Sequence, residues 1–484
     1  MRKKRLVVLG LLLCGLALMP PGSAAGMSFG NAAGGDTGAT GNTGGTDMEK
    51  KDGLYTDRAP SLEVEPLTAL SGEPWRIKVT GVVPGAPVRL VAEQEDGYGV
   101  KWESSAVFNA DYEGVVDPAV QAPVSGTYQG VDPAGLFWSM RPVSGVSAGA
   151  FGKSLAPQKI TISVEADGGR ILSRTVERLL LLPRVKRLEV REPGVVGTFF
   201  LPPGAGKRPA IIVLSGSEGG VYEPTAAIYA SHGYVTLALA YFGMEGLPSS
   251  LANIPVETVE RAISWLEAQP RVNKDAIGVW GASKGAELAL LAASYYPQIK
   301  AVVAKSPSAV VFEGTGADMG RNHKSSWTLN GEPLPFVPIV FNKELSDSFF
   351  AAMAKKQPWP TAPMYEYALQ NKEAVEKAAI KVEKINGPVL LVSGGQDGVW
   401  PAGRMAEMIM KRLEEKGHPF PDVHLHYEAA GHQISTPYSP TTVNWLTLPG
   451  NFVEDLGGTP AGNAAAAMDS WNKILTFLRT HLGE

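Results

Sequence analysis

The sequence is poor in cysteine and in charge. Of its 484 residues one is a cysteine, Cys14, which lies in an apolar stretch near the start of the chain. Without that stretch the chain would have no thiol, which excludes a disulfide framework and a cysteine nucleophile. Charged residues make up 19%, and 44 basic against 48 acidic residues give a net charge of −4. No positive field of the kind that binds nucleic acid is present, so we expect no nucleic-acid partner.

Long hydrophobic runs are also scarce, and the first one has the features of an export signal. The basic residues 2–5 precede the apolar residues 6–19, and small residues follow at 23–25. This order is typical of a secretory signal peptide. A bilayer-spanning helix needs roughly 20 apolar residues, so the stretch is too short to span a membrane. We therefore predict that residues 1–25 are a cleaved signal peptide, that the protein is periplasmic or secreted, and that it keeps no stable membrane span.

An alternative for this segment is a lipoprotein anchored through Cys14. Leu13 stands where such sites have a small residue, so we favour the cleaved signal. Residues 26–58 are rich in Gly, Thr, Asn and Ala. Because nothing in that stretch can bury a core, we predict a flexible linker.

Residues 59–183 have the pattern of a β domain. Short apolar alternations, such as residues 75–79, 88–92 and 159–164, are separated by Gly and Pro. This punctuation predicts an all-β, immunoglobulin-like sandwich. The segment contains no histidine, and we expect no catalytic cluster in it.

The hydrophobic pattern changes in residues 184–484. Apolar runs alternate with segments of helical spacing, the runs being residues 210–214, 234–239, 277–280, 301–304 and 389–392. This alternation predicts a doubly wound, mainly parallel sheet with helices on both faces. Ligands of such sheets bind beyond the carboxyl ends of the strands, so we expect the chemistry directly after these runs.

A candidate nucleophile follows one of these runs. Residues 281–285 read Gly-Ala-Ser-Lys-Gly, between the predicted strand at 277–280 and a helix-forming segment. The motif G-x-S-x-G in this context places a serine on a tight strand-to-helix turn with its hydroxyl exposed above the sheet. A serine hydroxyl needs a base, and the base needs an orienting group. A chance match at an ordinary helix cap is the weaker alternative for Ser283.

Candidates for both partners follow later strands. Asp397 comes after the run at 389–392, and His432 lies in a Gly-flanked loop after the alternating residues 423–427. Asp397 could instead cap the following helix. The order Ser283, Asp397, His432 matches the chain order of α/β-hydrolases, and we predict a catalytic triad from these residues.

The tetrahedral oxyanion would need two backbone donors. We predict the N–H groups of Lys284 and of Ser217, in the loop after residue 214, with Glu218 as the alternative to Ser217. The side chain of Lys284 could favour an anionic group on the substrate.

The remaining histidines suggest no metal centre. His424 and His426 share one strand face, but no third ligand has suitable spacing. We expect neither a metal nor a cofactor.

Several further motifs resemble those of the acyl-CoA thioesterase and bile acid-CoA:amino acid N-acyltransferase family. They lie at residues 126–128, 131–140, 237–243, 457–460 and 469–475. The resemblance covers roughly residues 61–482. It implies an α/β-hydrolase fold behind an amino-terminal β domain.

The resemblance also implies an activity. Family members that conjugate bile acids carry cysteine at the nucleophile position, whereas the thioesterases carry serine. Ser283 therefore implies hydrolysis of a small-molecule acyl thioester through an acyl-enzyme. An exported carboxylesterase, or transfer of the acyl group to an amine, is the alternative. Coenzyme A is a cytosolic cofactor, so the predicted export conflicts with a coenzyme A thioester as substrate.

The segment 306–386 interrupts the strand series and is rich in Pro, Trp and Phe. It could form a lid or substrate pocket, or it could pack against the β domain.

Overall fold

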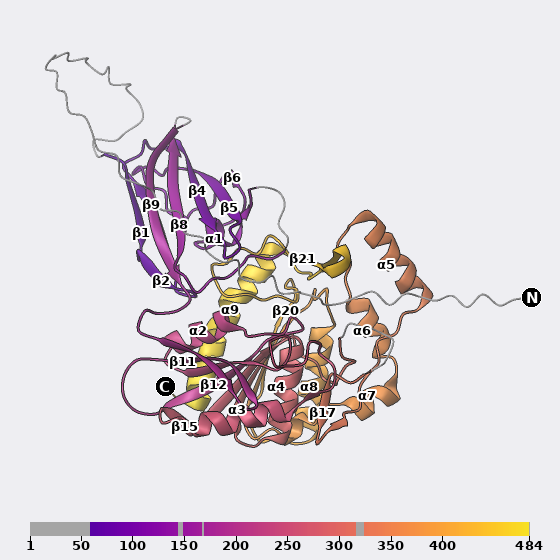
Figure 1. Ribbon diagram of the computed structural model, residues 1–484. Coiled ribbons are helices and arrows are strands. Elements are labelled where there is room, and N and C mark those ends of the chain that lie inside the picture. The colour runs from indigo at the N-terminus through magenta and orange to yellow at the C-terminus, as the bar shows by residue number, and fades with distance from the viewer. Residues whose placement is uncertain (1–58, 144–148, 167–168, 316–323, 484) are drawn as a thin grey trace, which may run out of the picture.

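The computed structural model describes residues 59–143, 149–166, 169–315 and 324–483. The predicted signal peptide and linker lie outside these residues. Within them the chain forms a β domain, residues 59–179, and an α/β domain that begins at β10 and includes the remaining described residues (Figure 1).

The β domain has two sheets that share one core. The larger sheet contains, in spatial order, β2 (Thr68–Leu70), β9 (Gly169–Leu179), β8 (Gln158–Ala166), β4 (Pro87–Glu95), β5 (Lys101–Asn109) and β6 (Ser125–Gly126), with β7 (Arg141–Pro142) also on β5. The smaller sheet pairs β1 (Ser61–Glu65) with β3 (Arg76–Thr80). Residues of alternating burial on these strands, together with the short helix α1 (Gly135–Trp138), fill the core between them. The predicted β architecture is confirmed, although the second sheet is small.

The α/β domain is built on an eight-stranded sheet. Its strands, in spatial order, are β10 (Lys186–Glu192), β11 (Val195–Leu201), β13 (Val235–Ala240), β12 (Arg208–Leu214), β15 (Val272–Ala282), β16 (Ile299–Lys305), β19 (Val389–Gly394) and β20 (Val423–Tyr427). The pairs from β13 to β20 are parallel, and the two pairs made by β11 are antiparallel. The predicted doubly wound sheet is confirmed.

Both faces of this sheet are covered by helices. One face packs against α3 (Glu257–Glu267), α4 (Lys284–Tyr295) and α8 (Ala402–Glu415). The other packs against α2 (Glu223–Ser231) and the long α9 (Pro460–Leu482). The central strands are buried on both faces, which explains their continuous apolar runs.

The segment between β16 and β19 packs on the α/β domain. It contains β17 (Trp327–Leu329), β18 (Glu332–Pro333), α5 (Lys343–Lys355), α6 (Ala362–Ala368), α7 (Lys372–Ala378) and the short helix η1 (Val382–Lys384), and β17 pairs with β14 (Ile254–Pro255). Its buried side chains, including Phe312, Trp327 and Trp359, belong to the core of the α/β domain. The segment lies on the side of the molecule away from the β domain (Figure 1). Packing against the β domain was the wrong alternative, and a lid remains a prediction.

The chain after β20 joins the two domains. It forms β21 (Trp445–Leu448), η2 (Pro449–Asn451) and β22 (Phe452–Asp455) before α9. Tyr438 is 4% exposed and lies in the β-domain core, edge-on to Trp75 and Phe137 with ring centroids 6.2 and 5.7 Å away. The N–H of Thr441 donates to the carbonyl of Trp138 at 3.0 Å.

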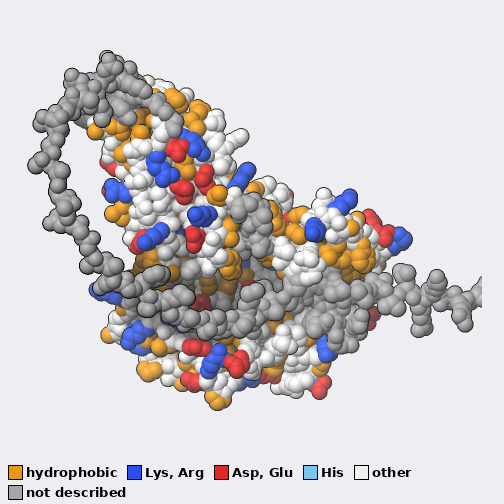
Figure 2. Space-filling model, turned by 45° about the horizontal axis from the view of Figure 1, so that its top comes forward, with side chains coloured by type: hydrophobic (Ala, Val, Ile, Leu, Met, Phe, Trp, Pro, Cys, Tyr) orange, Lys and Arg blue, Asp and Glu red, His pale blue; other side chains and the backbone are white. Residues whose placement is uncertain are grey.

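Charge is distributed evenly over the visible surface, where basic and acidic side chains are interspersed on both domains (Figure 2). None of the helices in the described part of the chain is both long and apolar enough to span a bilayer.

Candidate active site

Ser283 stands at a sharp turn between β15 and α4. Its backbone has φ 55° and ψ −123°, in the left-handed half of the map, and α4 begins at the next residue. Such a conformation costs a non-glycine residue about 1–3 kcal/mol, which surrounding structure must offset. The Ser283 N–H donates to the carbonyl of Lys305, at the end of the neighbouring β16, at 2.9 Å. The turn therefore presents the side chain of Ser283 above the carboxyl ends of the central strands.

The two glycines of the motif are required by close packing. A Cβ on Gly281 would lie 2.1 Å from the carbonyl oxygen of Gly285. A Cβ on Gly285 would lie 2.1 Å from the carbonyl oxygen of Ser215, in the loop after β12. Gly285 thus brings this loop into contact with the start of α4.

Asp397 and His432 form a close pair. Nδ1 of His432 lies 2.8 and 3.0 Å from the two carboxylate oxygens of Asp397. Asp397 also accepts the N–H groups of Val399 at 2.9 Å and Trp400 at 3.1 Å, so it is held in place after β19. Since Nδ1 is engaged by Asp397, Nε2 of His432 is the ring nitrogen for which the described residues provide no hydrogen-bond partner.

The histidine loop is connected to the serine turn. The hydroxyl of Ser306 donates to the carbonyl of His432 at 2.7 Å. Ser306 directly follows Lys305, whose carbonyl accepts the Ser283 N–H. Trp400 lies edge-on to the His432 ring, with centroids 5.9 Å apart, and its Nε1–H donates to the carbonyl of Ser306 at 3.1 Å. The structure therefore brings the three predicted triad residues to one end of the sheet.

The electrostatics of the pair favour a protonated histidine. Burial is the largest influence on the His432 pKa and lowers it. The charge and hydrogen bond of Asp397, with the charges of Glu454 and Glu218, outweigh burial and raise the pKa above its usual value. A histidine that is stabilised as a cation is suited to accept a proton during a reaction.

The loop after β12 lies against Ser283. A Cβ built on Gly216 would be 3.4 Å from Cβ of Ser283. The buried hydroxyl of Tyr241 donates to the carbonyls of Ser215 at 2.7 Å and Gly216 at 3.2 Å, which fixes the loop. Ser217 therefore lies in a loop that borders the serine turn.

The backbone N–H and the side chain of Lys284 lie in different environments. Its N–H is at the first position of α4, where helix N–H groups have no partner within the helix. Its side chain is buried and its Nζ contacts Glu287 at 3.1 Å, Ser326 at 2.8 Å and the carbonyl of Glu313 at 3.3 Å. The suggestion that this side chain favours an anionic substrate is wrong, because the charge is already neutralised inside the protein.

Glu287 completes the buried pair. Its carboxylate also accepts Nε1–H of Trp327 at 2.7 Å and the N–H of Phe312 at 3.3 Å. Burial lowers the pKa of Lys284 and raises the pKa of Glu287, while each partner's charge acts in the opposite direction.

Glu218 is a second acidic group beside the serine. Part of the Glu218 side chain is exposed to solvent. One of its carboxylate oxygens lies against Gly216, where a Cβ built on the glycine would be only 2.6 Å away. Burial of the carboxyl raises the Glu218 pKa more than the backbone N–H groups and His432 lower it.

Three other histidines make hydrogen bonds outside this site. His424 Nε2 and His426 Nδ1 both contact the buried hydroxyl of Ser393, at 2.8 and 2.9 Å. His418 contacts Asp422 at 2.6 Å. Across the described ranges no group of side chains is arranged to hold a metal ion.

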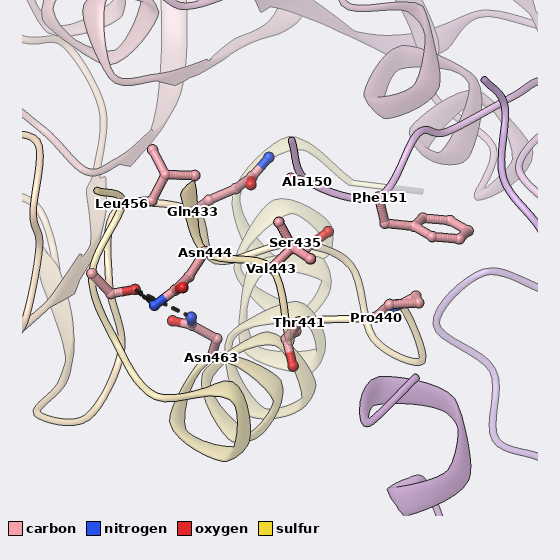
Figure 3. A pocket seen from close by; sticks show the side chains of 11 residues that line it. Ala150, Phe151, Gln433, Ser435, Pro440, Thr441, Val443, Asn444, Leu456 and Asn463 are labelled. Carbon is pink, nitrogen blue, oxygen red and sulfur yellow. Dashed lines mark hydrogen bonds between the residues drawn. The ribbon is translucent and has the colours of Figure 1, made fainter. Parts of the chain in front are cut away.

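A pocket opens beside the histidine loop, between the two domains (Figure 3). Its empty space, together with the part that is open solvent, is about 390 Å³. The lining comes from Ala150 and Phe151 of the β domain and from side chains within residues 433–463. Asn444 and Asn463 donate to the carbonyl of Gly457 at its wall. The lining includes no charged side chain.

Sequence reasoning missed the residues that support the site. Tyr241 lies in a motif that was quoted only for its resemblance, and Trp400 follows Asp397 closely, but neither role has a sequence signal. The sequence identifies Ser306 only as the first residue of the long insertion and gives no role to Lys305.

Comparisons with known proteins agree with this architecture. The family described as "BAAT / Acyl-CoA thioester hydrolase C terminal" matches residues 254–484, and "Acyl-CoA thioester hydrolase/BAAT N-terminal region" matches residues 72–192. Acyl-coenzyme A thioesterase 1 of Rattus norvegicus is 33% identical over 85% of this chain and 94% of its own length. The peroxisomal succinyl-coenzyme A thioesterase of Mus musculus is 33% identical over 88% of this chain and 97% of its own. The mitochondrial acyl-coenzyme A thioesterase 2 of Mus musculus is 32% identical over 87% and 90%. The chain therefore belongs to the acyl-CoA thioester hydrolase/BAAT family.

Proposed function

We propose that the chain hydrolyses acyl thioesters, in the manner of the acyl-CoA thioesterases it resembles, with Ser283 as nucleophile. The observation that carries this proposal is the serine on its positive-φ turn, linked through Lys305 and Ser306 to the His432–Asp397 pair. Membership of a family whose named relatives are acyl-coenzyme A thioesterases supports the reaction class.

In the proposed mechanism His432 acts first as a base. Nδ1–H donates to Asp397, so Nε2 accepts the proton of Ser283 while Oγ attacks the thioester carbonyl. The oxyanion is bound by the N–H groups of Lys284 and Ser217, a contribution of about 3 kcal/mol for each donor in comparable sites. Collapse of the intermediate releases the thiol, which takes the proton from His432. Water, activated by the same imidazole, then releases the acid and restores Ser283.

Reaction of the purified chain with a fluorophosphonate tests the nucleophile, with Ser283→Ala as the matched control. We expect labelling of the parent and none of the variant, because only an activated serine reacts. Hydrolysis of acyl-CoA should be lost in the same variant. Equal labelling of both proteins would refute the proposal.

The reaction products show whether water or an amine accepts the acyl group. A free acid is expected when the acyl thioester is incubated with an amino acid in excess. An amide in its place would mean acyl transfer to an amine, and turnover of simple esters alone would mean a carboxylesterase.

We also propose that residues 1–25 direct export and are removed. An exported enzyme would meet coenzyme A thioesters only where these leave the cytosol, so its substrates would include other thioesters. Amino-terminal sequencing of the mature protein is expected to begin near residue 26. An intact leader in the cytosolic fraction would overturn this proposal.

A further inference from the structure

A buried carboxyl group, on Glu454, lies behind the His432–Asp397 pair. Glu454 is in β22 and is 7% exposed. The chain directly after β22 contacts both members of the pair, because the carbonyl of Leu456 accepts the N–H of His432 at 2.7 Å and the N–H of Gly398 at 3.3 Å. The strand that contains Glu454 therefore packs against the turn that contains Asp397.

Thr361, directly before α6, connects the Glu454 carboxyl to that turn. Thr361 is 1% exposed, and its Oγ1 lies 2.8 Å from the carbonyl oxygen of Val399 and 3.1 Å from Oε1 of Glu454. Val399 in turn donates its N–H to the carboxylate of Asp397 at 2.9 Å. These contacts form one continuous path from Glu454 to the carboxylate that orients His432.

The hydrogen bonds of Thr361 indicate the protonation state of Glu454. A threonine hydroxyl has one proton to donate, and a backbone carbonyl can only accept. The proton therefore goes to Val399, which is the nearer partner. The contact with Glu454 is then a hydrogen bond only if the carboxyl group is protonated and donates to the Thr361 oxygen. If Glu454 were ionised, two acceptors would compete for one proton.

The charges around Glu454 favour the same state. Burial is the largest influence on the Glu454 pKa and raises it. The charge of His432 and the hydrogen bond with Thr361 act against burial, the charges of Asp397 and Asp455 act with it, and the pKa stays above its usual value. Among the described residues no lysine or arginine forms an ion pair with Glu454.

We propose that Glu454 carries its proton at neutral pH and is a positioning residue for the His432–Asp397 pair: as a carboxylic acid it donates to Thr361 and adds no second negative charge beside Asp397. The inference rests on the proposed function, because it concerns the base of that reaction. An ionised Glu454 would raise the pKa of His432 further. A smaller fraction of the imidazole would then be neutral and able to accept the serine proton.

Infrared spectroscopy measures the protonation state directly, because a carboxylic acid absorbs apart from carboxylates and its band shifts in heavy water. The Ser283→Ala chain should have such a band at neutral pH, and adding Glu454→Gln should remove it. Glu383→Gln is the matched control, since Arg412 contacts both oxygens of Glu383 at 2.6 and 2.7 Å and keeps that carboxylate ionised. The control should leave the band in place. A spectrum that Glu454→Gln does not change would overturn the proposal.

The acid limb of the pH–rate profile tests the effect on His432. Glu454→Gln keeps a neutral group that can donate to Thr361, so we expect kcat close to that of the parent and an acid limb at the same pH. If Glu454 were ionised, this variant would remove a negative charge, the His432 pKa would fall, and the limb would move to lower pH. That movement would overturn the proposal.

A second variant tests the hydrogen bond to Thr361. Glu454→Ala removes the donor, and kcat should fall about tenfold, the effect of losing one buried hydrogen bond. Glu454→Gln should avoid this loss, because its amide donates in place of the acid. An equal fall of kcat in Glu454→Gln would mean that the carboxyl group acts as an acceptor, and the proposal would be wrong.

The two kinds of measurement separate this proposal from the proposed function. The infrared band requires no turnover, so a band that depends on Glu454 in a chain without thioester hydrolysis would leave the protonated acid standing and refute the function. Hydrolysis through Ser283, with an acid limb that moves in Glu454→Gln, would do the reverse.

Discussion

At the scale of single residues, Asp397 governs the protonation of His432. Its carboxylate contacts Nδ1 at 2.8 Å and opposes the effect of burial on the pKa. The base must be neutral to accept the serine proton, so activity should fall as pH drops through a pKa above 6.5.

Asp397→Asn should lower kcat by about a thousandfold to ten-thousandfold, because the imidazole loses its orientation and its stabilised cation. The acid limb of the pH–rate profile should also move to lower pH, since the influence that raises the His432 pKa is gone. Asp422→Asn, in the unrelated pair with His418, should leave the acid limb in place. A profile that does not move in Asp397→Asn would contradict the assignment.

Tyr241 supports the loop that contains Ser217. Tyr241→Phe removes the two hydrogen bonds to the loop carbonyls, so the predicted oxyanion donor should shift and kcat should fall about tenfold, less than the loss of a whole donor. Tyr296→Phe is the control, because its buried hydroxyl has no partner among the described residues. Equal kcat values for the two variants would exclude this role for Tyr241.

The three candidate residues of the proposed triad could be named from the sequence because each follows a strand of the central sheet. The supporting residues could not, because their contacts join distant parts of the chain. The Ser306 hydroxyl meets a carbonyl 126 residues away, and Trp400 Nε1 meets one 94 residues away.

At the scale of elements, helix α4 is attached to the insertion by the Lys284–Glu287 pair. Lys284→Met should lower the free energy of unfolding by about 3–5 kcal/mol, because Glu287 is left buried without its counter-charge. The double variant Lys284→Met/Glu287→Gln should recover part of this loss. Lys473→Met, which breaks an exposed pair with Asp469, should cost under about 1 kcal/mol. Urea titration measures all three, and equal losses at the two sites would contradict the buried role.

The strands of the central sheet were predictable because burial on both faces leaves continuous apolar runs. The helices and strands of the insertion between β16 and β19 could not be predicted in this way. Helices α6 and α7 are short. Helix α5 packs on the α/β core, for example through Phe349 against Phe452 with ring centroids 5.6 Å apart. Composition identified the segment but not the surface it covers.

At the scale of the whole molecule, Tyr438 connects the two domains, because it belongs to the loop after β20 and is buried in the core of the β domain. Tyr438→Ala should cost about 3–5 kcal/mol of unfolding free energy, because it empties a site in the β-domain core. Tyr112→Ala is the control, since that ring is 85% exposed and should change stability little. Urea unfolding followed by fluorescence measures both. Equal midpoints for the two variants would mean that the domains are held together elsewhere.

The placement of Tyr438 has a consequence for motion. His432 and Tyr438 belong to the same loop, six positions apart, and Tyr438 is seated in the β-domain core. A swing of the β domain away from the α/β domain would therefore pull the imidazole away from the serine turn, and the enzyme would be inactive whenever the domains part. If His432 is the base, we expect catalytic turnover to require that the two domains stay in contact.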